Sequence, residues 1–267
     1  RDSGTVTNDA KITVNGKEIE LSALLEKWTA PLEKVFPTKA EVPEIEVDVP
    51  LYSERNTSSP AIKVAKPTVF IPVFPGTNCE VDTARAFEKA GANVEMLIVK
   101  NLSSNDIEET IDEMEKLIAK SQMIMLPGGF SGGDEPDGSG KFIATTFRNP
   151  RIAEQVNNLL KNRDGLMLGI CNGFQALIKL GLVPYGEIRE LKANDPTLTF
   201  NTIGRHISHM AYTRVTSVKS PWFANVNAGD VFAVPVSHGE GRFMADVETV
   251  KAVSYTHLRA HETAANL

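Results

Sequence analysis

Residues 165–181, GLMLGICNGFQALIKLG, join an apolar strand to an amphipathic helix through a glycine-flanked cysteine. The apolar run over 165–170 predicts a buried strand, and the helical spacing of apolar residues over 172–181 predicts a short helix that closes at Gly181. Between them, Gly-Ile-Cys-Asn-Gly has the spacing of a nucleophile elbow, in which the glycines allow a sharp turn. Cys171 then stands at a helix N-terminus, whose dipole favours a thiolate. A buried cysteine that merely fills a strand end is the plainer alternative.

An alternation of strands and helices extends upstream from this stretch to Thr68. We expect strands at TVFIPVF (68–74), NVEMLIV (93–99) and QMIMLP (122–127), and helices over 80–91, 106–120 and 149–162. The packed faces should carry Val81, Ala84 and Phe87 in the first helix and Ile107, Ile111, Met114 and Ile118 in the second. This order predicts right-handed crossovers and a parallel sheet with helices on both faces. After Thr202, AYTRVTSV (211–218) and DVFAVPVS (230–237) predict an antiparallel extension.

The two ends of the chain differ from this central part. Residues 1–37 carry one helical stripe, and residues 38–67 have recurring prolines and little periodicity, as in a linker or a wrapped arm. The main domain is expected over 68–250. Residues 251–267 fit no strand or helix pattern, so we interpret them as an artefactual tail and exclude His257 and His261 from the chemistry.

Composition excludes several classes of function. Of the 267 residues, 42% are hydrophobic and 23% are charged, which is ordinary for a globular protein. The net charge of −6 argues against a nucleic-acid partner, because binding the phosphate backbone normally needs a basic surface. No apolar run approaches the roughly 20 residues of a membrane span, so no membrane partner is expected. Two cysteines without a CxxC pair argue against a disulfide framework and structural zinc, and we expect a reduced, soluble, cytoplasmic protein.

His238-Gly239-Glu240 follows the last expected strand. A nucleophilic thiol needs a base that takes its proton and later returns it to the leaving amine, and the base needs a carboxylate to orient it. In an extended segment residues 238 and 240 point to the same side, so Glu240 can reach His238. The H-x-E pattern is weak alone, but together with the elbow it predicts a triad of Cys171, His238 and Glu240.

Pro127-Gly128-Gly129-Phe130-Ser131 stands at the C-terminal end of an expected strand. Glycines there allow main-chain N–H groups to approach a developing oxyanion. A plain glycine-rich loop and a phosphate cradle are the alternatives. The Walker pattern fails, because Glu135 stands where its first glycine belongs and Phe142 where Ser or Thr belongs.

Together, PGGFS (127–131), LGICNGFQ (168–175) and SHGEGRF (237–243) resemble class I glutamine amidotransferases. More narrowly, FPGTNCEVD (74–82), SPWF (220–223) and the HGEGRF ending are similar to the glutaminase domain of phosphoribosylformylglycinamidine synthase, over about residues 66–245. The resemblance implies a flavodoxin-like, doubly wound, mostly parallel α/β sheet with an antiparallel extension. It also implies hydrolysis of L-glutamine through a glutamyl thioester, with the ammonia passed to a synthetase half that makes formylglycinamidine ribonucleotide.

The resemblance assigns the site residues by motif. The implied triad consists of the nucleophile Cys171, the base His238 and its orienter Glu240. The groups implied to bind the oxyanion and the substrate glutamine are Gly129, Asn172, Gln175 and Ser131. No cofactor or metal is implied in this domain, and ATP and Mg²⁺ belong to the synthetase half. The leader EKWTAPLEKVFPTK (26–39) resembles the junction of the long, single-chain form, in which that half is fused. Residues 1–37 are therefore expected to be the tail of the preceding synthetase region.

Other reactive side chains are interpreted as structural. Cys79 lies in the opening motif without an elbow around it. For His206 and His209 no carboxylate or cysteine stands at ligand spacing, so packing or an interface is favoured over a metal. The acidic residues Asp134, Glu135 and Asp137 are interpreted as a solvated loop face, with an interface to the synthetase half as the alternative.

After Phe243 the chain departs from the family pattern, because the strands expected there are missing. We therefore expect a domain truncated at both ends, with an apolar surface left open beside His238. Two rival functions remain. One is another Cys-triad hydrolase of the same fold, such as a peptidase, and the other is an inactive module that only binds its synthetase partner.

Overall fold

The computed structural model describes residues 4–39, 49–57, 60, 62–132 and 140–250. The chain divides into two compact units, residues 1–44 and residues 45–267. In the first unit, β1 (Lys11–Val14) and β2 (Lys17–Glu20) form a hairpin around Asn15-Gly16, both of which have positive φ, as a tight hairpin turn requires. Helix α1 (Leu21–Thr29) follows and confirms the helix expected from the apolar stripe there.

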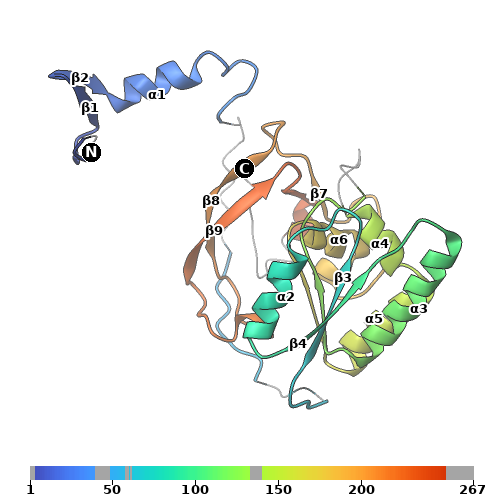
Figure 1. The fold of residues 1–267 in the computed structure, drawn as a ribbon. Helices are drawn as coiled ribbons and strands as arrows, with labels where there is room; N and C mark the ends of the chain where they lie inside the picture. Colours follow the sequence, from blue (N-terminus) through green and yellow to red (C-terminus); the bar gives the residue numbers. More distant parts are fainter. Residues whose placement is uncertain (1–3, 40–48, 58–59, 61, 133–139, 251–267) are drawn as a thin grey trace. The chain divides into compact units, whose positions relative to one another are not determined.

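Four parallel strands form the sheet of the second unit (Figure 1). They are β3 (Thr68–Val73), β4 (Asn93–Ile98), β5 (Met123–Leu126) and β6 (Leu166–Gly169), in the spatial order β4-β3-β5-β6. This is the flavodoxin-like order, so the predicted fold is confirmed. The strand order reverses between β3 and β5, which brings together the loops that follow these two strands. In open α/β sheets, ligands bind at such a switch point.

Helices cover both faces of this sheet, as predicted (Figure 1). On one face, α2 (Glu80–Lys89) packs Ala84 and Phe87 into a cluster with Val69 and Ile71 of β3. Phe70 points the opposite way, into a larger cluster built with α3 (Ser104–Lys120), α4 (Lys141–Phe147), α5 (Pro150–Asn162) and α6 (Asn172–Leu180). The alternation of β3 side chains between two covered faces explains why its sequence is a continuous apolar run.

Two residues expected on the packed helix faces are largely exposed. Val81 of α2 is 47% exposed and Ile107 of α3 is 50% exposed. Each lies in the first turn of its helix, before the buried residues Ala84 and Thr110, where the helix has yet to reach the sheet. The predicted stripe is therefore correct in spacing and too long by one turn.

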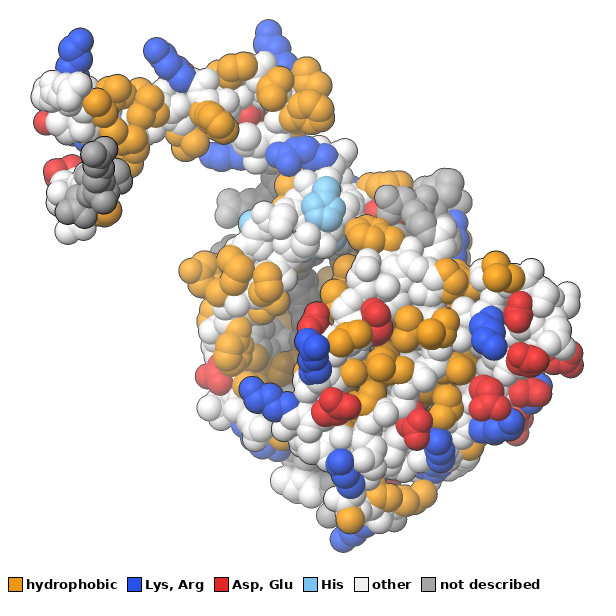
Figure 2. Space-filling model, in the orientation of Figure 1, with side chains coloured by type: hydrophobic (Ala, Val, Ile, Leu, Met, Phe, Trp, Pro, Cys, Tyr) orange, Lys and Arg blue, Asp and Glu red, His pale blue; other side chains and the backbone are white. Residues whose placement is uncertain are grey.

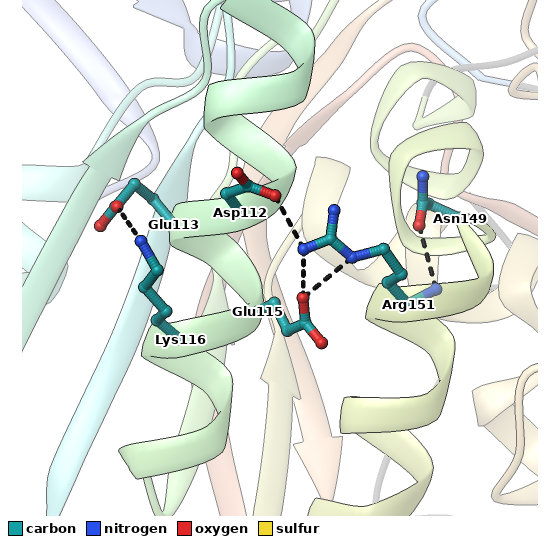
Figure 3. Close-up of polar contacts among 6 residues, drawn as sticks. All are labelled: Asp112, Glu113, Glu115, Lys116, Asn149 and Arg151. Carbon is teal, nitrogen blue, oxygen red and sulfur yellow. Dashed lines mark hydrogen bonds and ion pairs between the residues drawn. The ribbon is translucent and has the colours of Figure 1, made fainter.

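Ion pairs connect the exposed sides of α3 and α5 (Figure 3). The Arg151 guanidinium of α5 lies 2.7 Å from Asp112 and also contacts Glu115, both on α3. Asn149 caps α5 by accepting a hydrogen bond from the Arg151 main-chain N–H at 3.0 Å. Because these charged side chains are half exposed, water screens the ion pairs, and the packed helix faces contribute most of the stability.

An antiparallel ribbon follows the parallel sheet and confirms the predicted extension. Strands β8 (Ile207–Arg214) and β9 (Val231–His238) pair along their whole length, and β7 (Thr197–Thr199) pairs with β10 (Arg242–Met244). Strand β8 begins at Ile207 instead of the expected Ala211. Figure 2 shows hydrophobic side chains over the ribbon, where the large exposed ones include Met210, Tyr212 and Phe232. His238 pairs with Ile207 at one end of the two strands, and these exposed residues lie farther along them, so an apolar surface beside His238 stays a prediction.

Residues 49–57 run along this ribbon. Tyr52 forms a parallel bridge with Ser217, and the Arg55 guanidinium donates to the main-chain oxygens of Phe223 and Ala224 at 2.8 Å each. These two oxygens lie at the end of the 3₁₀ helix η1 (Pro221–Phe223). The segment is thereby tied to the domain over its described residues.

Two further elements complete the described structure. Trp222 of η1 packs against Phe87 with ring centroids 6.3 Å apart, and its indole N–H donates to the Met167 oxygen of β6. Helix α7 (Leu182–Tyr185) extends the chain beyond α6. Among the described residues, no helix combines the length and the apolar character needed to cross a membrane.

Candidate active site

Cys171 occupies the turn between β6 and α6 with φ 54° and ψ −112°. This conformation lies outside the allowed regions for a non-glycine residue and costs on the order of 1–3 kcal/mol. The flanking glycines make the turn possible. A Cβ on Gly169 would lie 2.6 Å from the Gly173 oxygen, and a Cβ on Gly173 would lie 2.0 Å from the Leu126 oxygen. The elbow leaves Cys171 exposed, which rules out the alternative of a buried cysteine.

The glycine-rich loop after β5 lies beside this turn. A Cβ on Gly128 would lie 3.2 Å from the Cys171 Cβ, so the loop contacts the cysteine directly. Gly129 has φ 125°, and a Cβ there would lie 2.5 Å from the Asn78 nitrogen in the loop after β3. Within the described residues, the main-chain N–H groups of Gly129 and Asn172 donate to no acceptor. Both are therefore available to a negatively charged oxygen near the thiol.

A buried chain of hydrogen bonds connects this loop to the H-x-E segment. The Ser131 main-chain N–H donates to Asn172 Oδ1 at 3.2 Å, and Asn172 Nδ2 donates to Gln175 Oε1 at 3.1 Å. Gln175 Nε2 donates in turn to the Glu240 main-chain oxygen at 3.0 Å. The three side chains of Ser131, Asn172 and Gln175 are buried, so these bonds are shielded from water. The structure thereby brings four of the predicted site residues together.

His238 ends strand β9, with its Nδ1 atom 2.9 Å from Asn201 Oδ1. Its Nε2 atom is buried and has no partner among the described residues. Burial lowers the pKa of His238 below its ordinary value, and the charges of His206 and His209 lower this pKa further. The imidazole is therefore neutral at pH 7, which is the form that can accept a proton.

Two contacts of the predicted triad are not made in this structure. No hydrogen bond joins the Cys171 thiol to His238 within the described part of the chain. The Nδ1 atom of His238 is bonded to Asn201 instead of Glu240, whose main-chain oxygen is held by Gln175. The triad itself remains a prediction.

The residues that were interpreted as structural take no part in these hydrogen bonds. Cys79 is exposed and precedes α2 in the left-handed helical region, with φ 68° and ψ 10°. His206 Nε2 lies 2.9 Å from Ser237 Oγ. No group of three His, Cys, Asp or Glu side chains gathers as a metal site in the ranges that the structure describes. The remaining candidates lie outside those ranges: Asp134, Glu135, Asp137, His257 and His261.

Asn201 was not identified by sequence reasoning. It precedes His238 by 37 positions and follows the short strand β7. An asparagine after a strand is an ordinary turn residue, so its identity alone gives no functional signal. Only the pairing of distant segments places its amide against the histidine.

Comparisons with known proteins found a matching family model and similar proteins. A family model described as the CobB/CobQ-like glutamine amidotransferase domain matches residues 66–262. The phosphoribosylformylglycinamidine synthase subunit PurQ of Dehalococcoides mccartyi is 33% identical over 180 residues, which cover 67% of this chain and 64% of that protein. The PurQ subunit of Methanococcus maripaludis is 34% identical over 193 residues, which cover 70% of this chain and 63% of that protein.

A solved structure, that of PurLQS from Thermotoga maritima, superposes with a TM-score of 0.50 at 27% identity. The match covers 68% of this chain and 70% of that chain. This chain thus spans slightly less than two thirds of the length of the two curated relatives named above.

Proposed function

The chain belongs to the CobB/CobQ-like glutamine amidotransferase domain family, and on that premise we propose that it is a glutaminase which supplies ammonia to phosphoribosylformylglycinamidine synthase. The ammonia would serve the ATP-dependent conversion of formylglycinamide ribonucleotide to formylglycinamidine ribonucleotide in purine biosynthesis. Relatives named as the PurQ subunit of that enzyme support this choice over another Cys-triad hydrolase.

The proposed reaction begins at Cys171. Its thiol loses a proton to His238 Nε2, and the sulfur attacks the side-chain amide carbon of L-glutamine. The carbonyl oxygen becomes an oxyanion, which the N–H groups of Gly129 and Asn172 stabilise. The C–N bond then breaks as His238 returns the proton to the nitrogen, which leaves as ammonia.

Hydrolysis of the resulting glutamyl thioester regenerates the site. His238 takes a proton from water, and the hydroxide attacks the thioester carbon. The C–S bond then breaks and releases glutamate, and His238 returns its proton to the thiolate, which restores the thiol. Glu240 completes the proposed triad by stabilising the imidazolium form of His238. Every catalytic group in these reaction steps belongs to the chain, and no cofactor is required in this domain.

One observation carries the proposal: the exposed thiol of Cys171 stands in an elbow conformation beside two main-chain N–H groups that have no acceptor among the described residues. Thiolate attack on an acyl carbon needs this combination of an accessible nucleophile and preorganised donors. Ser131 is retained as a substrate contact, because its Oγ atom is buried and has no hydrogen-bond partner among the residues that the structure describes. For Gln175 the same role would require its amide to release Asn172 or Glu240.

The proposed partner is a synthetase that accepts the ammonia and holds ATP and Mg²⁺. The superposition with PurLQS supports a partner of this kind. That the synthetase half is fused in the same chain remains a prediction from residues 26–39. A cytoplasmic location is proposed with it, since the purine-pathway reaction uses phosphorylated intermediates.

Ammonia release from L-glutamine tests the proposal. Cys171→Ala should abolish release, and Cys79→Ala should retain most of it, since Cys79 lies outside the elbow. Glu240→Gln should lower turnover, because a neutral amide stabilises the imidazolium less. Release that survives Cys171→Ala and disappears with Cys79→Ala would overturn the assignment. A folded wild-type chain that releases no ammonia, with or without a synthetase partner, would favour the inactive module.

A further inference from the structure

We propose that Asn201 is a positioning residue that holds His238 in the tautomer with a proton on Nδ1 and a lone pair on Nε2. The inference deepens the proposed function, on which it rests for the role of His238. It goes beyond the triad, because it gives the orientation of the resting imidazole to an amide instead of to Glu240.

Asn201 is the centre of a hydrogen-bond network around the H-x-E segment. Its side chain is almost fully buried, with 3% of the residue exposed. Its main-chain N–H donates to the Gly239 oxygen at 2.8 Å. Its Nδ2 donates to the oxygens of His238 at 2.8 Å and Arg205 at 3.0 Å, and its Oδ1 faces His238 Nδ1 at 2.9 Å and the Gly241 N–H at 3.2 Å.

These partners fix the direction of the Asn201 amide. Nδ2 faces two carbonyl oxygens, which can only accept hydrogen bonds, so this atom must be the nitrogen. Oδ1 faces the Gly241 N–H, which can only donate, so this atom must be the oxygen. A flipped amide would place two acceptors against an acceptor and a donor against a donor, in a buried site where such contacts are costly.

The direction of the amide fixes the tautomer of His238. An amide oxygen can only accept, so the Nδ1 atom facing it must carry a hydrogen. A neutral imidazole carries one N–H, and the lone pair therefore belongs to Nε2. Nε2 is the buried atom without a partner among the described residues, and it is the atom that the proposed mechanism uses as the base.

Packing holds the ring in place as well. A Cβ on Gly241 would lie 2.2 to 2.4 Å from the Cε1, Nδ1 and Nε2 atoms of His238. The imidazole therefore lies directly on the Gly241 backbone, and only glycine leaves room for it. The amide of Asn201 sets the rotation of the ring, and Gly241 supports its face.

Nitrogen NMR of the histidine side chains tests the tautomer directly and does not depend on activity. Above the pH at which His238 titrates, the wild-type protein should show its Nδ1 protonated and its Nε2 unprotonated. Asn201→Leu, which has similar size and no polar atoms, should lose this preference. Asn201→Asp should keep it, because a carboxylate oxygen can still accept from Nδ1, but it should also lower the free energy of unfolding, because its second oxygen faces the His238 and Arg205 oxygens. Glu240→Gln should leave the resting tautomer as in the wild type.

Kinetics provide the second readout. Asn201→Leu should lower kcat/KM for glutamine about 10- to 100-fold, mostly in kcat, which is part of the roughly 10²- to 10⁴-fold that a positioned general base contributes. Asn201→Asp should restore part of the loss. A wild-type spectrum with the proton on Nε2 would overturn the inference even if Asn201→Leu fails to fold. So would a tautomer that changes in Glu240→Gln and not in Asn201→Leu. An inactive chain with the predicted spectrum would contradict the proposed glutaminase function and leave the role of Asn201 intact.

Discussion

At the scale of single residues, the two cysteines differ in their backbone conformation. Both have positive φ, but Cys79 at φ 68° and ψ 10° lies close to the small left-handed region that is allowed for L-residues. Cys171 at ψ −112° lies in a region that only a sharply constrained turn maintains. Two glycines with no room for a Cβ build that turn. Strain of this kind concentrates at functional sites, so the backbone independently favours Cys171 over Cys79.

The pKa of His238 gives the first prediction. A base with a pKa below its ordinary value of 6.5 stays neutral to lower pH, so the acidic limb of kcat/KM for glutamine should lie below pH 6.5. Burial is the larger cause, and the charges of His206 and His209 are the smaller one. His206→Gln with His209→Gln should therefore move this limb to higher pH, by less than the whole displacement. Ammonia release measured over a pH series checks both statements, and a limb that moves to lower pH would contradict them.

At the scale of elements, helix starts position the site. Helix α6 begins immediately after Cys171 and buries Asn172 and Gln175 in its first turn. The side-chain amides of these two residues form the hydrogen bonds that connect the elbow to the main-chain oxygen of Glu240. The larger helices α3 and α5 pack on the same face of the sheet as α6 and share its hydrophobic cluster.

The start of α5 carries the second prediction. Asn149→Ala removes the side-chain cap on the Arg151 N–H and should lower the free energy of unfolding by about 1 kcal/mol (Figure 3). Asn149→Asp is the matched control, since its carboxylate can cap the helix and interacts favourably with the helix N-terminus. Urea unfolding of the three proteins measures the difference. An Asn149→Ala variant as stable as the wild type would show that the cap contributes nothing.

At the scale of the whole molecule, the parallel sheet could be predicted from the sequence, but many of the hydrogen bonds that build the site could not. The parallel strands are mostly apolar runs, although Glu95 interrupts β4, and the elbow is a local pattern of glycines, so both are visible within a few residues. The bond from Asn201 to His238 joins segments 37 positions apart, and the bond from Gln175 to Glu240 joins segments 65 apart. Such contacts depend on how the ribbon meets the sheet, which no local pattern encodes.

The segment of residues 49–57, which runs along the ribbon, gives the third prediction. Arg55→Ala removes charged hydrogen bonds to main-chain oxygens after η1 and should destabilise the second unit by about 1 kcal/mol. The main-chain N–H of Val218 donates to the Tyr52 oxygen, so its hydrogen exchange should become faster. Arg55→Lys should recover only part of the loss, because an ammonium cannot span the same set of oxygens. Unchanged hydrogen exchange at the Val218 N–H would contradict the role of Arg55 in holding residues 49–57 against the domain.

The central claim is that this chain builds a glutamine site around Cys171. Its most direct test is intact mass and peptide mapping after exposure to an electrophilic analogue of glutamine. We predict a single adduct on Cys171, no adduct on Cys79, and protection of Cys171 by excess L-glutamine but not by L-asparagine. An adduct on Cys79 alone, labelling of Cys171 that glutamine does not slow, or no adduct on a folded chain would contradict the claim.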